Sequence, residues 1–268
     1  MKTVVITGSA RGLGFEMAKV FRKNDFHVVI SDITKESLEL AETKLKEIEG
    51  KGEVFSIVCD VTKSNDIENM IQRVIEKFEK IHIWINNAGI NQPDEPIWCL
   101  EDTSIEKILT VDLWGTILCS KYIMKEMIKQ KEGAIYNVEG YGSNDAVMKG
   151  LSIYGTAKRG ITYFTEALAK ECEVENTGVI VGKLSPGIMI TDFITNALGN
   201  EKIILPEKTK KVYNILGDTP DVVASFLVKE MIRNQKNGKK IDWLPNRKAA
   251  FRFMTAAFNK RDFFKENI

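Results

Sequence analysis

Short apolar runs typical of buried strands alternate with longer amphipathic stretches of helical periodicity along most of this chain. Strands that are apolar on both faces favour a parallel sheet whose two faces are covered by the intervening helices. The pattern therefore predicts an α/β fold, a single doubly wound domain of about seven parallel strands flanked by helices. The expected strands are 3–7, 27–31, 53–58, 81–85, 134–138, 179–184 and 240–243, and the expected helices are 12–24, 35–49, 65–79, 103–130, 152–175 and 220–234.

The composition is that of an ordinary globular protein. Among the 268 residues, 44% are hydrophobic, and 38 Lys and Arg residues nearly balance 37 Asp and Glu residues. This balance gives no reason to expect nucleic acid as a partner. Because the chain begins with a strand-like run, we expect no signal peptide, no membrane-spanning helix and a cytoplasmic location. Scattered cysteines indicate reduced, mostly buried thiols, and two isolated histidines indicate no metal site (Cys59, Cys99, Cys119, Cys172, His27 and His82).

A glycine-rich segment, TGSARGLG at 7–14, separates the first expected strand from the first expected helix. Gly8 allows a tight turn, Gly12 lets the backbone approach a pyrophosphate, and Gly14 permits close packing of the helix on the strand. The N-terminus of the helix offers free N–H groups and the positive end of its dipole to phosphate. The segment thus predicts a dinucleotide site in a Rossmann-type domain, in preference to a loop that serves packing alone.

Two charged residues near this loop bear on which dinucleotide binds. Asp32 ends the second expected strand, where a carboxylate can accept hydrogen bonds from an adenosine ribose and repels a 2′-phosphate. Arg11 argues the other way, because a cation beside the loop can pair with that phosphate. We expect the carboxylate to prevail, since placing it against a phosphate dianion is costly. NAD(H) is therefore favoured as the cofactor, and NADP(H) stays open as the alternative.

The spacing of these glycines, together with five further motifs, resembles the short-chain dehydrogenase/reductase family. The motifs occur in the family's order: T-G-x-x-x-G-x-G at 7–14, Asp32, Cys59-Asp60-Val61, Asn86-Asn87-Ala88-Gly89, Tyr154-x-x-x-Lys158 and Pro186-Gly187-x-x-x-Thr191. The resemblance implies one NAD(P)-binding domain at 1–243. It also implies hydride transfer between a nicotinamide cofactor and an alcohol, ketone or aldehyde, and assembly as a homodimer or homotetramer.

By this resemblance, the cofactor lies along the glycine loop, and Asp60 and Val61 border its adenine. The turn after the fourth strand runs under it, and the turn after the sixth strand holds the nicotinamide carboxamide. Simpler interpretations stay open for single motifs, because Asp60 can cap a helix and N-N-A-G can form an ordinary turn. The predicted cofactor residues are Gly8, Ala10, Arg11, Gly12, Leu13, Gly14, Asp32, Asp60, Val61, Asn87, Ala88, Gly89, Tyr154, Lys158, Pro186, Gly187, Met189 and Thr191.

Tyr154 and Lys158 share one face of the helix after the fifth strand, at the sheet edge where doubly wound folds bind ligands. An isolated pair with this spacing is commonly a solvated helix edge, but within the family motif it implies catalysis. The Lys158 ammonium is expected to favour the phenolate and to lower the pKa of Tyr154 from about 10. Tyr154 can then exchange a proton with the substrate oxygen. The family resemblance implies that Lys158 also holds the nicotinamide ribose.

Two positions depart from the family pattern. Gly140 stands where the family has the serine that holds the substrate oxygen. Ser143 is the predicted substitute, and a loop serine that bonds backbone is the alternative. Asp112 stands where the family has an asparagine that bends its helix and holds a water beside the lysine. An aspartate there can accept hydrogen bonds and is expected to continue the proton relay as a catalytic residue, but it adds a negative charge near Lys158. These departures motivate a rival hypothesis, a dinucleotide-binding sensor or scaffold with little turnover.

The segment 137–158 is similar to a narrower branch, the chlorophyll b reductase-like proteins. That resemblance implies reduction of a carbonyl on a large apolar substrate. Residues near 192–217 are expected to form a mobile lid, with ordinary packing of a loop as the alternative. Residues 244–268 form a basic, Phe-rich extension. Three interpretations of it stay open: packing on a neighbouring subunit or the active-site rim, contact with an anionic membrane surface, and ordering by ligand.

Overall fold

The computed structural model of this chain describes residues 1–190, 206–258 and 261–264. Within these ranges the core is one sheet of seven strands in the order β3-β2-β1-β4-β5-β6-β7, and every neighbouring pair is parallel. This sheet confirms the predicted doubly wound α/β fold. The strands are β1 (Thr3–Thr7), β2 (His27–Asp32), β3 (Val54–Val58), β4 (Ile83–Asn86), β5 (Gly133–Val138), β6 (Val179–Ser185) and β7 (Lys240–Asp242).

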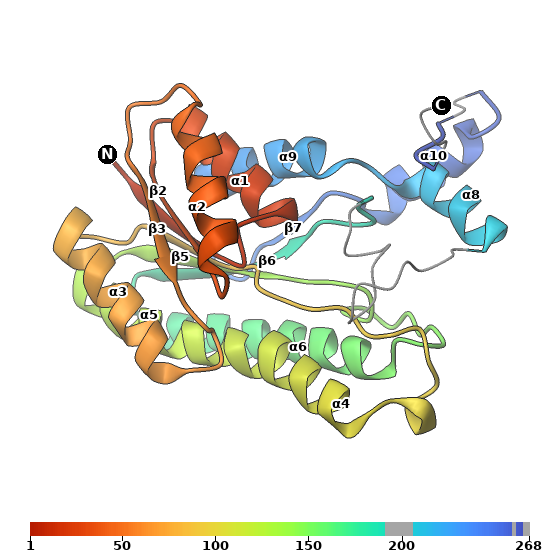
Figure 1. Cartoon of the computed structure of the whole chain (residues 1–268), viewed down its shortest axis with the longest axis horizontal. Coiled ribbons are helices and arrows are strands. Elements are labelled where there is room, and N and C mark those ends of the chain that lie inside the picture. Colours follow the sequence, from red (N-terminus) through yellow and green to blue (C-terminus); the bar gives the residue numbers. More distant parts are fainter. Residues whose placement is uncertain (191–205, 259–260, 265–268) are drawn as a thin grey trace.

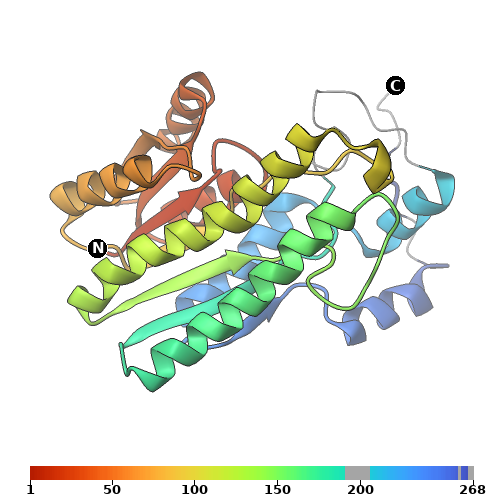
Figure 2. The same ribbon diagram turned by 90° about the horizontal axis from the view of Figure 1, so that it is seen from below.

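Helices cover both faces of the sheet (Figure 1). One face is covered by α1 (Gly12–Lys23), α2 (Lys35–Lys46) and α9 (Pro220–Arg233), and the other by α3 (Ser64–Phe78), α5 (Gly115–Gln130) and α6 (Ser152–Val174). Seen from below, α5 and α6 lie side by side beneath the strands (Figure 2). The shorter elements are η1 (Ile97–Cys99), α4 (Asp102–Ile108), α8 (Glu207–Leu216) and α10 (Asn246–Thr255).

The central strand β1 shows why the sequence forms these layers. All five of its residues are buried. Val4 and Ile6 pack in the hydrophobic cluster with α1, α2 and α9, whereas Val5 packs in the cluster with α3, α5 and α6. Because alternate side chains of a strand point to opposite faces, one run of β-branched residues contributes to both cores. Each fully buried Val or Ile side chain contributes about 1.5–3 kcal/mol relative to exposure.

The predicted helix over 103–130 is helical throughout, but it is not one regular α-helix. α4 runs into a π-helical turn, Leu109–Trp114, before α5 begins at Gly115. Hydrophobic periodicity does not reveal where a helix accommodates an extra residue, so the sequence pattern passes over this turn. Single π turns are frequent at functional sites, and this one carries Asp112, whose side chain is fully buried.

Two helices lie outside the predicted elements. α8 and α10 pack together at the end of the molecule where the parallel strands finish (Figure 1). α8 falls within the predicted lid near 192–217, of which 192–205 lie outside the described residues. No helix within the described ranges is both long and apolar enough to cross a membrane. All four cysteines are free thiols, and three are buried, whereas Cys99 is exposed.

The strand order reverses between β1 and β4, and ligands of doubly wound folds bind at such a point, outside the carboxyl ends of the strands. A buried amide network lies beneath it. Asn86 Nδ2 donates to Ser120 Oγ (2.9 Å) and to Asn137 Oδ1 (2.7 Å). Asn137 Nδ2 in turn donates to Thr165 Oγ1 (2.9 Å). These bonds fix β4 and β5 relative to α5 and α6, the elements that carry the candidate site.

Candidate active site

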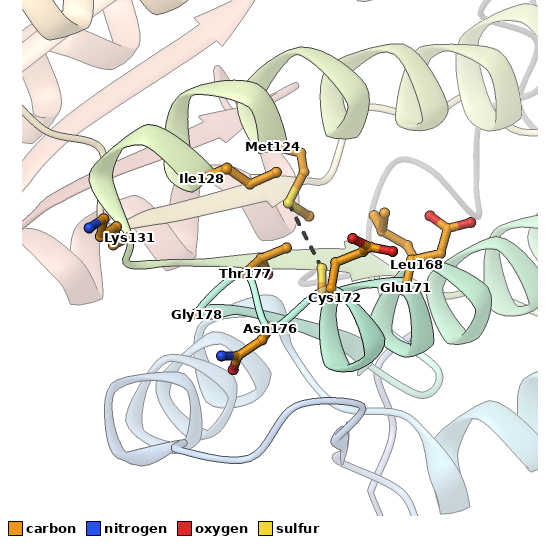
Figure 3. A pocket seen from close by; sticks show the side chains of 10 residues that line it. Met124, Ile128, Lys131, Leu168, Glu171, Cys172, Asn176, Thr177 and Gly178 are labelled. Carbon is orange, nitrogen blue, oxygen red and sulfur yellow. Dashed lines mark hydrogen bonds between the residues drawn. The ribbon is translucent and has the colours of Figure 1, made fainter.

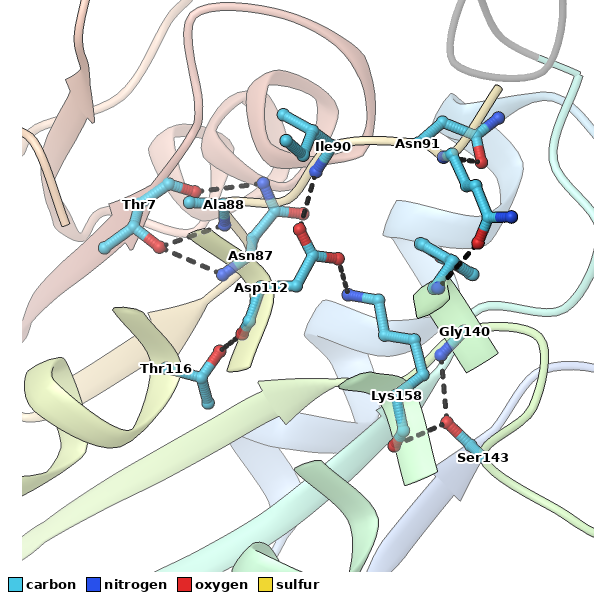
Figure 4. A network of polar contacts seen from close by, with 12 residues as sticks. Thr7, Asn87, Ala88, Ile90, Asn91, Asp112, Thr116, Gly140, Ser143 and Lys158 are labelled. Atoms are coloured by element: carbon cyan, nitrogen blue, oxygen red, sulfur yellow. Dashed lines mark hydrogen bonds and ion pairs between the residues drawn. The ribbon is translucent and has the colours of Figure 1, made fainter. Parts of the chain in front are cut away.

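The glycine loop after β1 docks on the turn that follows β4 (Figure 4). Thr7 Oγ1 accepts hydrogen bonds from the backbone N–H groups of Asn87 (3.0 Å) and Ala88 (3.1 Å). The Asn87 side-chain amide donates to the carbonyl groups of Thr7 (3.0 Å) and Gly8 (2.8 Å). Gly8 has a φ of +59°, and a Cβ atom there would lie 2.6 Å from Ala88 Cα, so this position requires glycine. Asn87 and Ala88 therefore position the loop.

The start of α1 fits an anionic group. Arg11, which flanks the helix, is extended and gives no side-chain cap, and the first turn has no acidic residue. The N–H groups of this turn can therefore bind an external acceptor at the positive end of the helix dipole. Gly12 has a φ of +61°, and a Cβ atom there would meet nothing within 4 Å, so the loop is open above it. Leu13 is buried, and the nearest neighbours of Gly14 are Asn87 and the loop backbone, whereas the sequence predicted contact with the strand.

Asp32, the last residue of β2, lies beside the same loop. Its carboxylate accepts hydrogen bonds from the backbone N–H groups of Ala10 (3.3 Å) and Ile33 (2.9 Å). An anion held there can accept hydrogen bonds from ribose hydroxyls and repels a 2′-phosphate. Arg11 is exposed. The residues present thus fit a dinucleotide with a pyrophosphate over the loop and a free ribose diol beside Asp32.

The predicted adenine-bordering pair, Asp60 and Val61, lies in the turn between β3 and α3. Asp60 Oδ1 accepts hydrogen bonds from the N–H group (3.0 Å) and the hydroxyl (2.7 Å) of Thr62, and Asp60 Oδ2 pairs with Lys63 Nζ (3.2 Å). The carboxylate therefore shapes this turn, which is a local structural role close to the simpler interpretation of the motif. Val61 is buried, and it lies so close to Gly115 that a Cβ atom at that glycine would be 2.8 Å from its Cγ2 atom.

The turn predicted to hold the nicotinamide follows β6. Pro186 and Gly187 come directly after this strand, and Gly187 has a φ of +70°, which favours glycine. Met189 packs partly buried against the core and forms a β-bridge with Asp218. Thr191 lies outside the described residues. The structure therefore places the Pro-Gly turn at the carboxyl end of the sheet, beside the strand that neighbours β5.

Tyr154, Lys158 and Asp112 come together in one buried cluster. Lys158 Nζ lies 3.2 Å from Asp112 Oδ2 and 5.4 Å from the centre of the Tyr154 ring. The backbone N–H of Ile90 donates to Asp112 Oδ1 (2.8 Å), so the turn after β4 helps to hold the pair (Figure 4). A Cβ atom at Gly89 would be 3.2 Å from Asp112 Oδ2 and 3.4 Å from Lys158 Nζ, which shows how closely the backbone passes.

Burial and charge together set the protonation of this cluster. Burial raises the pKa of Tyr154; the Lys158 ammonium opposes this shift and the Asp112 carboxylate adds to it, so the pKa lies above the usual value for tyrosine. The predicted effect of Lys158 has the expected sign, but the predicted net lowering is wrong because burial and Asp112 outweigh it. Burial lowers the pKa of Lys158, but the charge and hydrogen bond of Asp112 together with the charge of Tyr154 outweigh burial, so the pKa lies above the usual value for lysine. Near neutral pH, Lys158 is an ammonium and Tyr154 a phenol.

The loop after β5 contains Gly140 at the position where the family has a serine, and Ser143 three residues later. Gly140 takes that place, and a Cβ atom built on it would overlap the Tyr154 hydroxyl. Ser143 Oγ accepts a hydrogen bond from the Gly140 N–H (3.1 Å) and donates to the Lys158 carbonyl (3.3 Å). These bonds fold the loop after β5 back onto α6, as in the alternative interpretation of a loop serine that bonds backbone. The Ser143 hydroxyl thus contacts α6 at the backbone carbonyl of Lys158.

Gln92 is a site residue that no sequence motif indicates. Its Oε1 accepts hydrogen bonds from the backbone N–H groups of Ile153 (2.8 Å) and Tyr154 (3.0 Å). Leu151, which precedes α6, gives no side-chain cap, so Gln92 caps the helix that carries the catalytic pair. The side chain is buried, and Nε2 has no hydrogen-bond partner in the described part of the chain. A cap supplied by a distant loop leaves no local pattern, and only proximity to the N-N-A-G turn hints at it.

A separate groove of about 750 Å³ lies at the far end of α6 (Figure 3). Its apolar lining comes from Met124, Ile128, Leu168 and Cys172. Cys172 is about 27 Å along the helix axis from Tyr154, so this groove does not belong to the catalytic cluster. The described residues contain no group of His, Cys, Asp and Glu side chains that could hold a metal ion.

The chain matches known proteins over most of its length. The family model for short chain dehydrogenases matches residues 2–202. A probable chloroplastic chlorophyll(ide) b reductase of Arabidopsis thaliana is 32% identical over 259 residues, which are 91% of this chain and 50% of that protein. A chloroplastic chlorophyll(ide) b reductase of Oryza sativa subsp. japonica is 33% identical over 228 residues, 84% of this chain and 65% of that protein. The chain therefore spans between half and two thirds of the length of these relatives.

A crystal structure of a short chain dehydrogenase from Bacillus anthracis has the same fold, with a TM-score of 0.74 and 28% identity over 90% of this chain and 95% of that one. The strand order and the open glycine loop are those of a doubly wound fold of the nucleotide-binding type. The chain belongs to the short chain dehydrogenase family, a family of oxidoreductases that act on CH–OH or C=O groups. Both resemblances seen in the sequence, to the family and to its chlorophyll b reductase-like branch, are confirmed.

We predict that Gln92→Leu lowers the free energy of unfolding by about 2–4 kcal/mol, because two buried N–H groups of α6 lose their acceptor. Urea unfolding followed by circular dichroism measures this change. Gln72→Leu on α3 is the matched control, since Gln72 is exposed and bonds only its neighbour Glu76. Equal midpoints for the two variants would show that the cap contributes nothing.

Proposed function

We propose that this chain is an oxidoreductase that interconverts an alcohol with a ketone or aldehyde, prefers NAD(H), and uses Tyr154 as its general acid and base. The observation that carries the proposal is the buried cluster of Tyr154, Lys158 and Asp112 beside a glycine loop that fits a pyrophosphate. A structural ion pair alone would not require a tyrosine next to it, nor an uncapped helix N-terminus at the same edge of the sheet.

Each member of the cluster has a distinct part in the proposed reaction. The nicotinamide, when bound, supplies or receives the hydride. The Tyr154 hydroxyl gives a proton to the substrate oxygen in reduction and takes it back in oxidation. Lys158 stabilises the phenolate that forms at Tyr154 and can hold the ribose hydroxyls beside it. Asp112 fixes the Lys158 ammonium in place and compensates its charge.

The raised pKa of Tyr154 supports reduction as the favoured direction near neutral pH. A phenol is the form that can donate a proton to a carbonyl oxygen as hydride arrives, whereas oxidation of an alcohol begins with the phenolate. Burial and the Asp112 carboxylate both hold Tyr154 in the phenol form. The buried site also limits water that would compete for the proton.

Removal of the Tyr154 hydroxyl tests the proposal most directly. Tyr154→Phe should lower kcat for reduction of apolar ketones and aldehydes by about 10²–10⁴-fold, because the proton donor is lost while the ring remains. NADH consumption by ultraviolet absorbance gives the rate, and calorimetry checks that NADH still binds. Tyr163→Phe is the control, since Tyr163 lies exposed on the same helix. Unchanged turnover with intact NADH binding would contradict the assignment and favour the sensor hypothesis.

The cofactor preference rests on Asp32. NADH should bind at least about tenfold more tightly than NADPH, and Asp32→Ala should remove most of this difference, because the repulsion of a 2′-phosphate is lost. Isothermal titration calorimetry with both dinucleotides measures it. Glu36→Ala, an exposed acidic residue at the start of α2, is the control. Tighter binding of NADPH by the wild type would show that Arg11 prevails over Asp32.

The aspartate at position 112 gives a pH prediction. Its negative charge raises the pKa of Tyr154, so Asp112→Asn should lower that pKa and leave the Lys158 ammonium uncompensated beside the phenol. Oxidation of an alcohol needs the phenolate and rises with pH through this pKa. The rising limb of its pH–rate profile should therefore move to lower pH in Asp112→Asn. A move to higher pH would show instead that Lys158 loses its proton once Asp112 is neutral.

The substrate proposed here is a large apolar carbonyl compound or alcohol. Trp98 in η1 is 83% exposed and Val147 in the loop before α6 is 93% exposed, and both segments lie at the carboxyl end of the sheet (Figure 1). Exposed apolar side chains beside a site are typical of a surface that an apolar ligand covers. The chlorophyll(ide) b reductase relatives support the same substrate class. A panel of aldehydes and ketones of increasing hydrophobic size would contradict it if small polar carbonyls gave the higher kcat/KM.

We also propose that the chain assembles with copies of itself through α5 and α6. Trp114, the last residue of the π turn before α5, and Tyr163 on α6 are exposed, and the apolar groove of Figure 3 lies between the ends of α5 and α6. Exposed aromatic residues on two adjacent long helices are typical of a subunit interface. A monomer at every concentration in sedimentation equilibrium would contradict this assembly.

A further inference from the structure

The polarity of α10 is inverted with respect to an ordinary surface helix. Its charged side chains Lys248 and Arg252 face the protein body. Lys248 Nζ donates to the Trp243 carbonyl (3.0 Å) and lies over the Trp243 ring. Arg252 forms an ion pair with Asp218 Oδ2 (2.6 Å) and donates to the Leu216 carbonyl at the end of α8 (2.9 Å). The helix is therefore attached to the body through its cations.

Asp218 is the anchor of this attachment. It is buried, and besides Arg252 it pairs with Arg261 (3.0 Å) and accepts a hydrogen bond from Trp243 Nε1 (2.7 Å). Several charge-assisted bonds to one buried carboxylate hold an orientation more firmly than a single surface ion pair. The outward face of α10 is thus fixed by the contacts that the inner side of this helix makes with the protein body.

That outward face is apolar. Phe251 is 61% exposed and Met254 is 72% exposed, and their spacing of three residues puts them on one side of the helix. Phe258, which is 92% exposed, lies in the turn that follows the helix. Phe253 is also half exposed. A surface helix normally directs such side chains to the core and its charges to water. Here the fixed orientation does the reverse, which marks α10 as a contact surface.

The charges around this face indicate an anionic partner. Arg247, one turn before Phe251 on the same side, is exposed, and α10 contains no Asp or Glu. The neighbouring α8 adds exposed Lys208 and Lys211. A twofold contact of this face with a second copy would gather the cations of both chains, without a carboxylate of α10 to pair with them. Phenyl groups flanked by cations match the apolar boundary and anionic headgroups of a lipid surface.

The position of the face adds a functional reason. Figures 1 and 2 both place α8 and α10 at the end of the molecule where the strands finish, which is the end that carries Tyr154. We propose that the outer face of α10, with the exposed lysines of α8, docks the enzyme on an anionic membrane surface. Docking there turns the mouth of the active site toward the lipid phase, from which an apolar substrate can enter without crossing water.

Vesicle flotation tests this docking without any need for turnover. The full chain should float with vesicles of phosphatidylcholine and phosphatidylglycerol, float less with phosphatidylcholine alone, and be released by salt. Phe251→Ser combined with Phe258→Ser should lower the partition coefficient at least about tenfold, and Arg247→Glu combined with Lys211→Glu should do the same for the anionic vesicles. Leu40→Ser is the control, because Leu40 is exposed and apolar but lies on α2.

Three results would overturn the proposal. The first is a wild type that stays in the lipid-free fraction with both kinds of vesicle. The second is equal flotation of the wild type and the two α10 variants. The third is an oligomer that Phe251→Ser with Phe258→Ser dissociates in sedimentation equilibrium, which would assign the face to a second copy. NADH affinity by calorimetry confirms that each variant is folded, and loss of docking with retained turnover leaves the proposed function intact.

Discussion

The buried ion pair between Lys158 and Asp112 is the interaction on which the catalytic end of this molecule depends. Removing one partner of a buried ion pair costs about 3–5 kcal/mol, because the remaining charge is left uncompensated. The π turn before α5 brings Asp112 to the pair, and the Thr116 hydroxyl donates to the Asp112 carbonyl (2.7 Å) within the irregular turn. The backbone N–H of Ile90 donates a hydrogen bond to Asp112 Oδ1. Three separate segments are thereby held around one pair of charges.

The pair also explains the character of the tyrosine. In a site with a lysine alone, the ammonium acts on Tyr154 without compensation and favours the phenolate. Here burial and the Asp112 carboxylate both raise the pKa of Tyr154, and together they outweigh the opposing effect of the Lys158 ammonium. The aspartate at the family's asparagine position therefore changes the electrostatics around Tyr154, while Gln92 and the close contact with Gly140 keep Tyr154 in position.

Features encoded locally were predictable from the sequence, and features made by contacts between distant segments were not. Alternating apolar runs located every strand of the sheet because burial on both faces leaves a continuous pattern, as in Val4, Val5 and Ile6. Motif spacing located the glycine loop, Tyr154 and Lys158. The cap from Gln92, the π turn and the inward cations of α10 each depend on a partner that is remote in the chain. Hydrophobic periodicity carries no information about such a partner. The same is true of the hydrogen bonds that Ser143 Oγ forms with the backbone.

The reversal of strand order between β1 and β4 has a consequence for how the molecule is made. β1 pairs with β4 only after β2, β3 and the helices between them have been synthesised. The hydrogen bond between Thr7 at the end of β1 and Asn87 after β4 therefore forms late. The ion pair of Asp112 cannot form until Lys158 has also been synthesised. Non-local closure of this kind slows folding and exposes apolar strands in the interval. In a nascent chain that stops before α6, the Asp112 carboxylate therefore has no Lys158 to pair with. The cluster around it can form only after the rest of the sheet has folded.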